Sequence, residues 1–300
     1  MENQTITPAL ATVATLQERA ILVSITIAGW SGRIKDKDAT ADVTSTNHAE
    51  TGAASVTKAL LPKTALAAIK TLDREIREYH YRVTLPWSNG AQMLAAKTIS
   101  DYRERIEEYD RKRQGLINQL LATYESAKES ARYSLGDLWK SEDYPSEEEL
   151  RSKYSLTYSF DQITGGGDFR VQLDKELMDA IRTETDAAAN EHIEQMLLDP
   201  YRRVKEVAEK MAERLRAHGE KEPGNKKANA FRDSLIENAR DLVAVLPALN
   251  LTNDPALEEL RQTLQTLASA EPKDLRDNDA LRDQTATKAE ELVKSLEGIF

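Results

Sequence analysis

An alternation of apolar and polar positions predicts three short strands in this chain. β-Branched apolar residues occupy every second position at 21–28, and the turn residues Gly29-Trp30-Ser31-Gly32 follow them. The same period of two recurs at 154–160 and at 169–173, with three glycines at 165–167 between the two runs. We therefore expect one early strand and one later hairpin with a long loop. Three short strands do not make a domain alone, so a small antiparallel sheet covered by helices is expected.

Two long segments have the period of an α-helix instead. In residues 91–139 the apolar positions lie three or four residues apart, and only Arg113 interrupts the stripe. A helix of that length would be about 70 Å long, whereas a compact chain of this size is about 50 Å across. The second segment, 173–218, contains Asp199-Pro200, where we expect a kink or a restart with Asp199 as the N-cap. The two segments are expected to return as an antiparallel hairpin.

Shorter helical patterns cover 64–82, 230–246, 254–268 and 278–296. The fold class predicted is mainly α, of the α+β type: long antiparallel helical or coiled-coil rods, a small antiparallel β-sheet head and a C-terminal helical bundle. Residues 219–229 are rich in Gly, Pro and charge, which predicts a linker. The expected division is an N-terminal arm at 1–20, the β head with its rods at 21–218, this linker, and a C-terminal helical unit at 230–300.

Composition agrees with a helical protein and narrows its setting. Only 6% of the 300 residues are aromatic and 12 are Gly, while 40% are hydrophobic, which is enough to form a core. The absence of Cys excludes disulfides and thiol chemistry. A net charge of −10 argues against wholesale coating of nucleic acid or of an anionic membrane. The sequence shows neither a basic leader nor an apolar run of membrane-spanning length, so we expect a cytoplasmic protein.

The sequence carries no motif of a common enzyme class. No phosphate loop, dinucleotide-binding turn, hydrolase elbow or zincin helix is present. Asp254 with the run 271–273 superficially offers the carboxylates and lysine of a metal-dependent nuclease, but no predicted strand aligns them. His192, among glutamates on a helix, is more typical of a solvated surface than of a metal site. We expect no catalytic, metal-binding or cofactor-binding residues, no cofactor and no enzyme activity; a metal-dependent hydrolase or nuclease is the least favoured alternative.

Residues 201–232 form the most basic stretch, with ten Lys or Arg against five acids. Such a patch can contact the phosphates of a nucleic acid. Lys and Arg interleaved with Glu at helical spacing more often form an exposed face laced with salt bridges. We favour the salt-bridged interpretation and keep nucleic-acid binding in replication or recombination as an alternative. Its candidate residues are Arg202, Arg203, Lys205, Arg214, Arg216, Lys226 and Lys227.

Two tryptophans, Trp30 and Trp87, lie in predicted turns close to glycine. A tryptophan in such a place can anchor a protein partner or cap the core of the sheet, and we favour capping. The candidate partner-binding residues are Trp30, Arg33, His80, Trp87 and Arg170.

Several polar and aromatic runs together carry a family resemblance. They are W-S-G-R-x-K-D-K at 30–37, His48, Leu85-Pro86-Trp87 with Gly90, Asp143-Tyr144-Pro145, Asp168-Phe169-Arg170, and the stretch from Phe231 to Thr252. In these runs the chain, from Ile21 onward, resembles a family of unknown function encoded by tailed bacteriophages, prophages and conjugative elements. Its members often occur beside a MoxR-type AAA+ ATPase and a von Willebrand A-domain protein like the cobaltochelatase subunits. The resemblance implies an adaptor or client of that machine and supplies no active site.

The function expected from these observations is that of a non-enzymatic phage or mobile-element scaffold or adaptor. Long apolar stripes on helices have to be covered by another protein surface, and no cluster of catalytic residues accompanies them. We expect protein partners, an AAA+ ATPase among them, self-association into a homo-oligomer, no membrane, and a place in the cytoplasm of the host cell if a phage encodes the chain.

Overall fold

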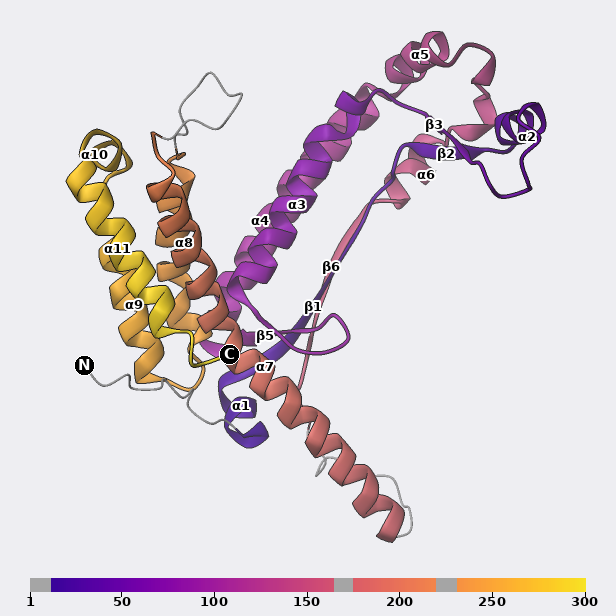
Figure 1. Ribbon diagram of the computed structural model, residues 1–300. Coiled ribbons are helices and arrows are strands. Elements are labelled where there is room, and N and C mark those ends of the chain that lie inside the picture. The colour runs from indigo at the N-terminus through magenta and orange to yellow at the C-terminus, as the bar shows by residue number, and fades with distance from the viewer. Residues whose placement is uncertain (1–11, 165–174, 220–230) are drawn as a thin grey trace. The chain divides into compact units, whose positions relative to one another are not determined.

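The computed structural model describes residues 12–164, 175–219 and 231–300 and divides the chain into two units (Figure 1). Unit 1 contains Met1–Ser24, Tyr81–Ile99 and Phe160–Phe300, and unit 2 contains Ile25–His80 and Ser100–Ser159. Each unit is assembled from segments that are distant in the sequence. The fold is mainly helical with a small antiparallel sheet, as predicted.

The larger sheet has the strand order β4-β5-β1-β6. Strand β1 (Ala20–Ala28) pairs antiparallel with β5 (Gln92–Ala95), and β5 pairs antiparallel with β4 (Leu85–Pro86). Strand β6 (Ser155–Asp161) lies on the other side of β1. Strands β1 and β6 confirm the predictions at 21–28 and 154–160. The strand predicted at 169–173, and with it the hairpin, lies outside the described residues.

Strand β5 corrects the prediction that a helix begins at residue 91. Residues 92–95 pair with β1 on one side, and residues 92 and 93 pair with β4 on the other, so the backbone of this segment forms hydrogen bonds within the sheet. Met93, Leu94 and Ala95 are all buried. Strand propensity depends strongly on such tertiary partners, which a helical spacing of apolar residues does not report. The helix α4 begins only at Ile99.

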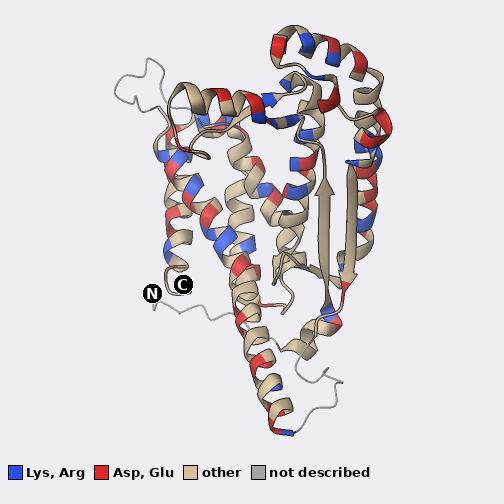
Figure 2. Ribbon diagram, turned by 90° about the vertical axis from the view of Figure 1, so that its right-hand side faces the viewer, with Lys and Arg blue, Asp and Glu red and all other residues tan. Residues whose placement is uncertain are grey.

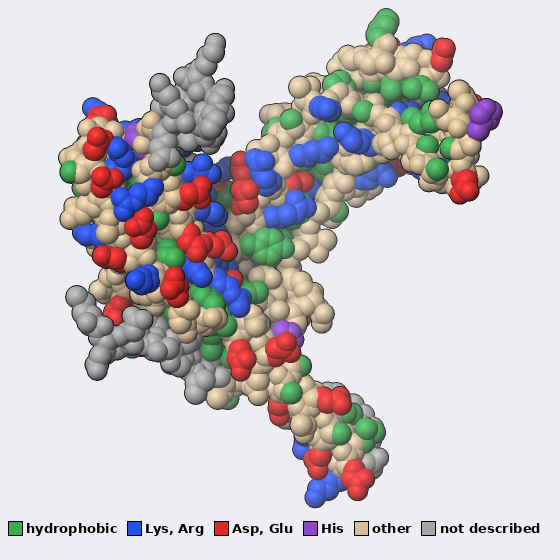
Figure 3. All heavy atoms as spheres, in the orientation of Figure 1, with side chains coloured by type: hydrophobic (Ala, Val, Ile, Leu, Met, Phe, Trp, Pro, Cys, Tyr) green, Lys and Arg blue, Asp and Glu red, His purple; other side chains and the backbone are tan. Residues whose placement is uncertain are grey.

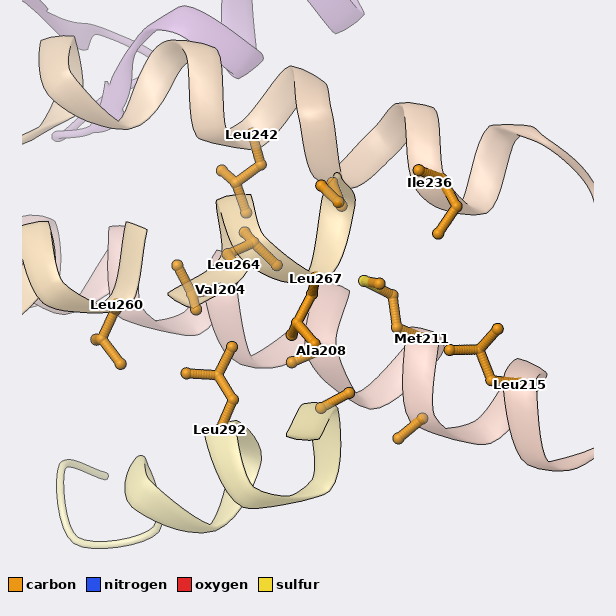
Figure 4. Packing of buried hydrophobic residues seen from close by; sticks show 14 of the residues in the cluster. Val204, Ala208, Met211, Leu215, Ile236, Leu242, Leu260, Leu264, Leu267 and Leu292 are labelled. Carbon is orange, nitrogen blue, oxygen red and sulfur yellow. The ribbon is translucent and has the colours of Figure 1, made fainter. Parts of the chain in front are cut away.

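A helical bundle forms the main core of unit 1 (Figure 4). It joins the C-terminal half of α7 (Lys175–Arg216) to α8 (Ser234–Leu249), α9 (Pro255–Ala268) and α11 (Asp279–Ser295), with the short α10 (Pro272–Asp277) before α11. Val204, Ala208 and Met211 of α7 face Leu242 of α8 and Leu264 of α9 in this core. Every one of these helices has its apolar residues at three- and four-residue spacing, which is why one face of each is buried.

A second cluster of unit 1 lies at its sheet. It contains Leu16 of α1 (Val13–Arg19), Leu85 and Met93 of the sheet, and Ile193 and Met196 of α7. Helix α1 begins at a capping box, in which Thr12 and Thr15 exchange side-chain to backbone hydrogen bonds. The middle of α7 therefore packs on the sheet and its C-terminal half packs in the bundle.

Of the two outcomes predicted at Asp199-Pro200, the restart is wrong, because α7 continues through Pro200 as one helix of 42 residues, and the kink stays a prediction. Pro200 costs one backbone hydrogen bond, since it has no N–H to donate. Asp199 does not cap a new helix. Its carboxylate instead pairs with Arg203 one turn later, at 2.6 Å. Burial of Pro200 and Tyr201 in the packed interior stabilises the helix across this point.

The structure divides the chain differently from the division expected at 219–229. Residues 220–230 lie outside the described part of the chain, but the helices on either side of them share one core. Leu215 of α7 and Ile236 of α8 belong to the same buried cluster. The C-terminal helices are therefore part of unit 1 and not a separate unit.

Unit 2 contains an antiparallel helical hairpin, built from α3 (Ala67–Val83) and α4 (Ile99–Ala122). Asp73 pairs with Arg113, and His80 with Tyr102, so residue numbers rise on one helix as they fall on the other. This corrects the expected pairing of 91–139 with 173–218, since α4 and α7 belong to different units. The segment 91–139 is also not one helix. It breaks at Thr123, between α4 and α5 (Tyr124–Leu135), and α5 ends at Gly136, whose φ is +52°.

The rest of unit 2 is held by a buried ion-pair cluster. Strands β2 (Arg33–Asp36) and β3 (Val56–Ala59) pair antiparallel, and helix α2 (Lys37–Thr46) lies between them in the sequence. Helix α6 (Glu147–Ser152) comes directly before strand β6 in the sequence. The Lys58 ammonium lies 2.9 Å from Asp36 and 2.6 Å from Asp143, and it donates to the Leu138 carbonyl at 2.8 Å. Burial by itself lowers the pKa of Lys58, but its hydrogen bonds to the two carboxylates outweigh burial and raise the pKa.

Candidate partner-binding site

Helix α7 has two halves of opposite charge (Figure 2). Residues 175–194 carry six acids and two bases, whereas residues 201–216 carry six bases and three acids. Negative charge near a helix N-terminus and positive charge near its C-terminus oppose the helix dipole, so this gradient stabilises the helix itself. The gradient also makes the N-terminal half a strongly acidic surface.

The N-terminal half of α7 carries an apolar stripe that leaves the bundle core. Leu177 is 46% exposed, Met178, Ile181 and Thr185 are half-buried, and burial becomes complete only from Ala189 onward. At 100° per residue these positions, with Ala188 and His192, fall on one face of the helix. The stripe continues into Ile193 and Met196, which are buried at the sheet.

Acidic side chains border this stripe along both edges. Glu184 and Glu191 are seven residues apart and lie on one edge, and Asp179 and Asp186 lie seven apart on the other. Figure 3 shows Asp and Glu side chains gathered on this half of the helix. We define residues 175–192 as the acidic arm. An apolar stripe between acidic edges is the arrangement by which one helix docks against another, with the stripe supplying affinity and the edges selecting the charge of the partner.

Two of the six bases in the basic half of α7, Arg203 and Arg216, form close ion pairs within unit 1. Arg203 pairs with Asp199 and donates to the carbonyls of Arg82 and Thr84 at 2.8 and 2.7 Å. Arg216 binds Glu290 at 2.8 Å and lies 3.5 Å from Asp283. These contacts hold α7 against its neighbours in unit 1, and the salt-bridged interpretation of the whole stretch stays a prediction.

The remaining nucleic-acid candidates make weaker contacts or are not described. Arg202 and Lys205 lie over the Phe300 ring, at 5.9 and 5.2 Å from its centroid. Arg214 lies 3.7 Å from the adjacent Glu213 on the exposed face of α7. Lys226 and Lys227 lie outside the described residues.

The two tryptophans belong to different units, and each packs on a core. In unit 2, Trp30 is half-buried against the core that contains Leu66 and Tyr124, with its ring edge-on to Tyr124 at 6.3 Å. In unit 1, Trp87 packs on the sheet cluster, 5.4 Å from the His192 ring. These positions fit the capping interpretation of both residues.

The other three partner-binding candidates have different surroundings. Arg33 is exposed on β2. His80 is buried, with only 1% of its surface exposed, and its Nδ1 lies 2.8 Å from the Tyr102 hydroxyl. Burial lowers the pKa of His80 from 6.5 to about 4, so the ring is neutral at pH 7. A ring so enclosed is a core group and cannot contact a partner. Arg170 lies outside the described residues.

The carboxylates considered for a nuclease have structural contacts. Asp254 caps α9, and its Oδ2 accepts a hydrogen bond from the buried Tyr201 hydroxyl at 2.6 Å. Glu271 pairs with Arg240 at 2.8 Å. Among the described residues, no three His, Asp or Glu side chains are grouped to hold a metal ion. No described helix is both long enough and apolar enough to cross a membrane.

Comparison with family models, curated proteins and solved structures gives no match for this chain. The family resemblance described above therefore stays a prediction. The acidic arm was not among the candidates expected from the sequence, although its signal is present there: six acids within twenty residues beside an apolar stripe. What the sequence alone did not indicate is that the stripe leaves the core at residue 189.

Proposed function

We propose that the protein is a non-enzymatic scaffold or adaptor that acts through protein-protein contacts, and that the acidic arm is its docking helix. The observation that carries this proposal is the exposure of the arm. A helix of 42 residues commits its C-terminal half to the bundle, while its first turns leave Leu177 exposed and Met178 and Ile181 half-buried. Apolar side chains aligned on one exposed helix face mark a surface suited to a partner.

The occupant proposed is a basic amphipathic helix of another protein. Lys and Arg at the edges of such a helix would lie beside Glu184 and Glu191 on one side and Asp179 and Asp186 on the other. A second copy of the arm fits poorly, because acid would face acid along both edges and like charges across an interface disfavour binding. The arm therefore selects a partner of opposite charge.

Self-association of the whole chain, and origin in a phage or mobile element with an AAA+ ATPase as partner, remain predictions. The first follows from the long apolar stripes, and light scattering measures it: a homo-oligomer has a multiple of the mass of one chain. The others rest on the family resemblance alone. Nucleic-acid binding by residues 201–232 predicts binding that falls steeply with salt, whereas the pairing of Arg203 and Arg216 with acids supports a structural role for this stretch.

The docking proposal is tested with a defined probe, a fluorescently labelled helical peptide with a leucine stripe and lysines at its edges. Its anisotropy is measured with the full chain at low and at physiological salt. We expect saturable binding that weakens as salt rises, because the edge charges are exposed and screened. The same peptide with glutamates at its edges should not bind.

Two matched pairs of substitutions locate the contact. Glu184→Lys with Glu191→Lys should weaken binding of the lysine peptide by about tenfold or more. Glu129→Lys with Glu148→Lys changes the net charge equally at exposed positions of unit 2 and should leave binding unchanged. Equal binding of both peptides, or equal losses in both double variants, would show that the arm is not the docking helix.

A further inference from the structure

Unit 2 contains a pocket of about 280 Å³ that none of the functions above uses. It lies between the turn that follows β1, at Gly29, Trp30 and Ser31, and one face of α3. Its apolar lining comes from Trp30, Leu66, Ile69 and Tyr154. A pocket of this size holds a small organic group, close to the lower limit of the usual range for ligand sites of about 300 Å³.

Two cations at this pocket have no acidic partner among the described residues. Lys70 and Arg77 lie seven residues apart on α3 and both line the pocket. The Lys70 ammonium donates to the Ser31 carbonyl at 3.3 Å, and Arg77 donates to the carbonyls of Asp73 and Ile27 at 3.1 and 3.4 Å. Backbone carbonyls carry no net charge, so both positive charges remain uncompensated.

Asp73 carries the one carboxylate that lines the pocket, and its charge is already neutralised by an ion pair with Arg113. The buried Arg113 donates from Nε to Asp73 Oδ1 at 2.7 Å and from Nη2 to the Ala28 carbonyl. A Cβ on Gly29 would lie 3.7 Å from the same Nη2, so the Arg113 guanidinium lies directly behind the backbone of the pocket. With Arg113 and Asp73 cancelling, the pocket keeps two positive charges from Lys70 and Arg77.

Two buried donors beside the pocket also lack an acceptor in the described part of the chain. They are the hydroxyl of Tyr154, a lining residue that is only 8% exposed, and Nη1 of the fully buried Arg113. Burial raises the pKa of Tyr154 to about 12, so its hydroxyl keeps its proton at pH 7.

We propose that this pocket binds a small anion with an aromatic or apolar body. Lys70 and Arg77 bind the anionic oxygens, of a carboxylate or a phosphate, and the body packs against Trp30 and Tyr154. The two charges supply attraction, and the aromatic lining separates such a ligand from an inorganic ion. This site lies wholly in unit 2, so this proposal does not depend on the proposal for the acidic arm.

Calorimetric titration of the full chain with three probes tests the proposal. The probes are 3-phenylpropionate, phenyl phosphate and inorganic phosphate. We expect one of the two aromatic anions to bind at least tenfold more tightly than inorganic phosphate, and the comparison between them identifies carboxylate or phosphate as the preferred group. Amide NMR signals of residues 29–31 should shift on titration. Binding of inorganic phosphate as tight as that of both aromatic anions would overturn the proposal, as would no binding by any probe.

Substitutions on one helix supply the matched control. Lys70→Glu and, separately, Arg77→Gln should each weaken binding about tenfold or more. Arg74→Glu removes a neighbouring exposed cation, which pairs with Glu78 and does not line the pocket, and it should leave binding unchanged. Because Lys70 is exposed, its variant should fold, and unchanged amide spectra away from the pocket check this. Equal weakening by Arg74→Glu would show a diffuse charge effect and not a site.

Discussion

The two units build their interiors from different chemistry. The bundle cluster of unit 1 consists of apolar side chains from α7, α8, α9 and α11. Unit 2 also buries ionisable groups: Arg113 with Asp73, Lys58 with Asp36 and Asp143, and the His80–Tyr102 pair. Among the described residues of unit 1, the buried polar ones are Thr84, Asp254 and Thr285. Directional contacts, which are ion pairs and hydrogen bonds, therefore contribute more to the interior of unit 2 than to that of unit 1.

This difference affects how each unit specifies its structure. Apolar contacts are non-directional, so the bundle needs residues of suitable size at suitable spacing. A buried charge is costly without its partner, and each pair therefore favours one register of the helices that carry it. Asp73 opposite Arg113 and His80 opposite Tyr102 together define one antiparallel register for α3 and α4.

The largest effect is expected from breaking the Arg113 pair. Asp73→Ala leaves the fully buried guanidinium without its carboxylate, which should cost unit 2 about 3–5 kcal/mol of unfolding free energy. Native-state hydrogen exchange measures this as a loss of protection in the amides of α3 and α4. Protection in α8, α9 and α11 should not change.

The double variant Arg113→Met with Asp73→Leu is its control. Removing both charges leaves no buried ion unpaired, so much of the lost stability should return. A cost below about 1 kcal/mol for Asp73→Ala would contradict the importance given to this pair.

A core deletion in unit 1 should have an effect of intermediate size. Leu264 is fully buried among α7 and α8 residues, and Leu264→Ala should cost about 3 kcal/mol because it leaves a cavity. Exchange should accelerate in the bundle helices and not in α4. Leu264→Met keeps the volume and should cost less than about 1.5 kcal/mol. Similar costs for both substitutions would argue against close packing at this point.

The smallest effect concerns the pH dependence of unit 2. The folded pKa of His80, about 4, lies below its ordinary value of 6.5, so the unfolded chain binds more protons between these values. Stability contributed by neutral His80 is therefore present above pH 6.5 and is lost as the pH falls toward 4. Between pH 7 and pH 5.5 the loss should be about 1 kcal/mol.

This loss is measured by chemical denaturation at each pH, with the hydrogen exchange of the amides of unit 2 as the readout. The double variant His80→Leu with Tyr102→Phe removes both members of the pair, and its stability should fall less than that of the wild type over the same range of pH. An identical pH dependence in both proteins would mean that His80 is not the group responsible.

The elements with a long and regular pattern were predictable. Helices α9 and α11 appear where their apolar spacing and their Asp or Asn caps place them, and β1 ends at the turn residues that follow it. Four short strands, β2, β3, β4 and β5, were missed, because two or four residues carry too little periodicity to compete with a helical pattern around them. Arg113 shows the limit most clearly: it interrupts an apolar stripe in the sequence, yet it is fully buried because Asp73 lies opposite.

The candidate sites were predictable only in part, because the sequence shows which residues are present but not which of them are exposed. The sequence shows that Trp30 follows a strand and that α7 is acidic near its start, but neither observation reports exposure. His80 was expected at a surface and is enclosed beside Tyr102, because α4 folds back over α3. The pocket at Lys70 and Arg77 unites a turn, a helix and Tyr154, and Tyr154 is more than 70 residues from the other two in the sequence.

The sequence by itself determined the helical character, the strand β1 and the charge gradient of α7, because these depend on residues within a few turns of one another. The tertiary structure alone decided which helices pair, which charges are buried and where the stripe of α7 becomes exposed. Those outcomes depend on contacts between distant segments, whose free energy no local pattern contains.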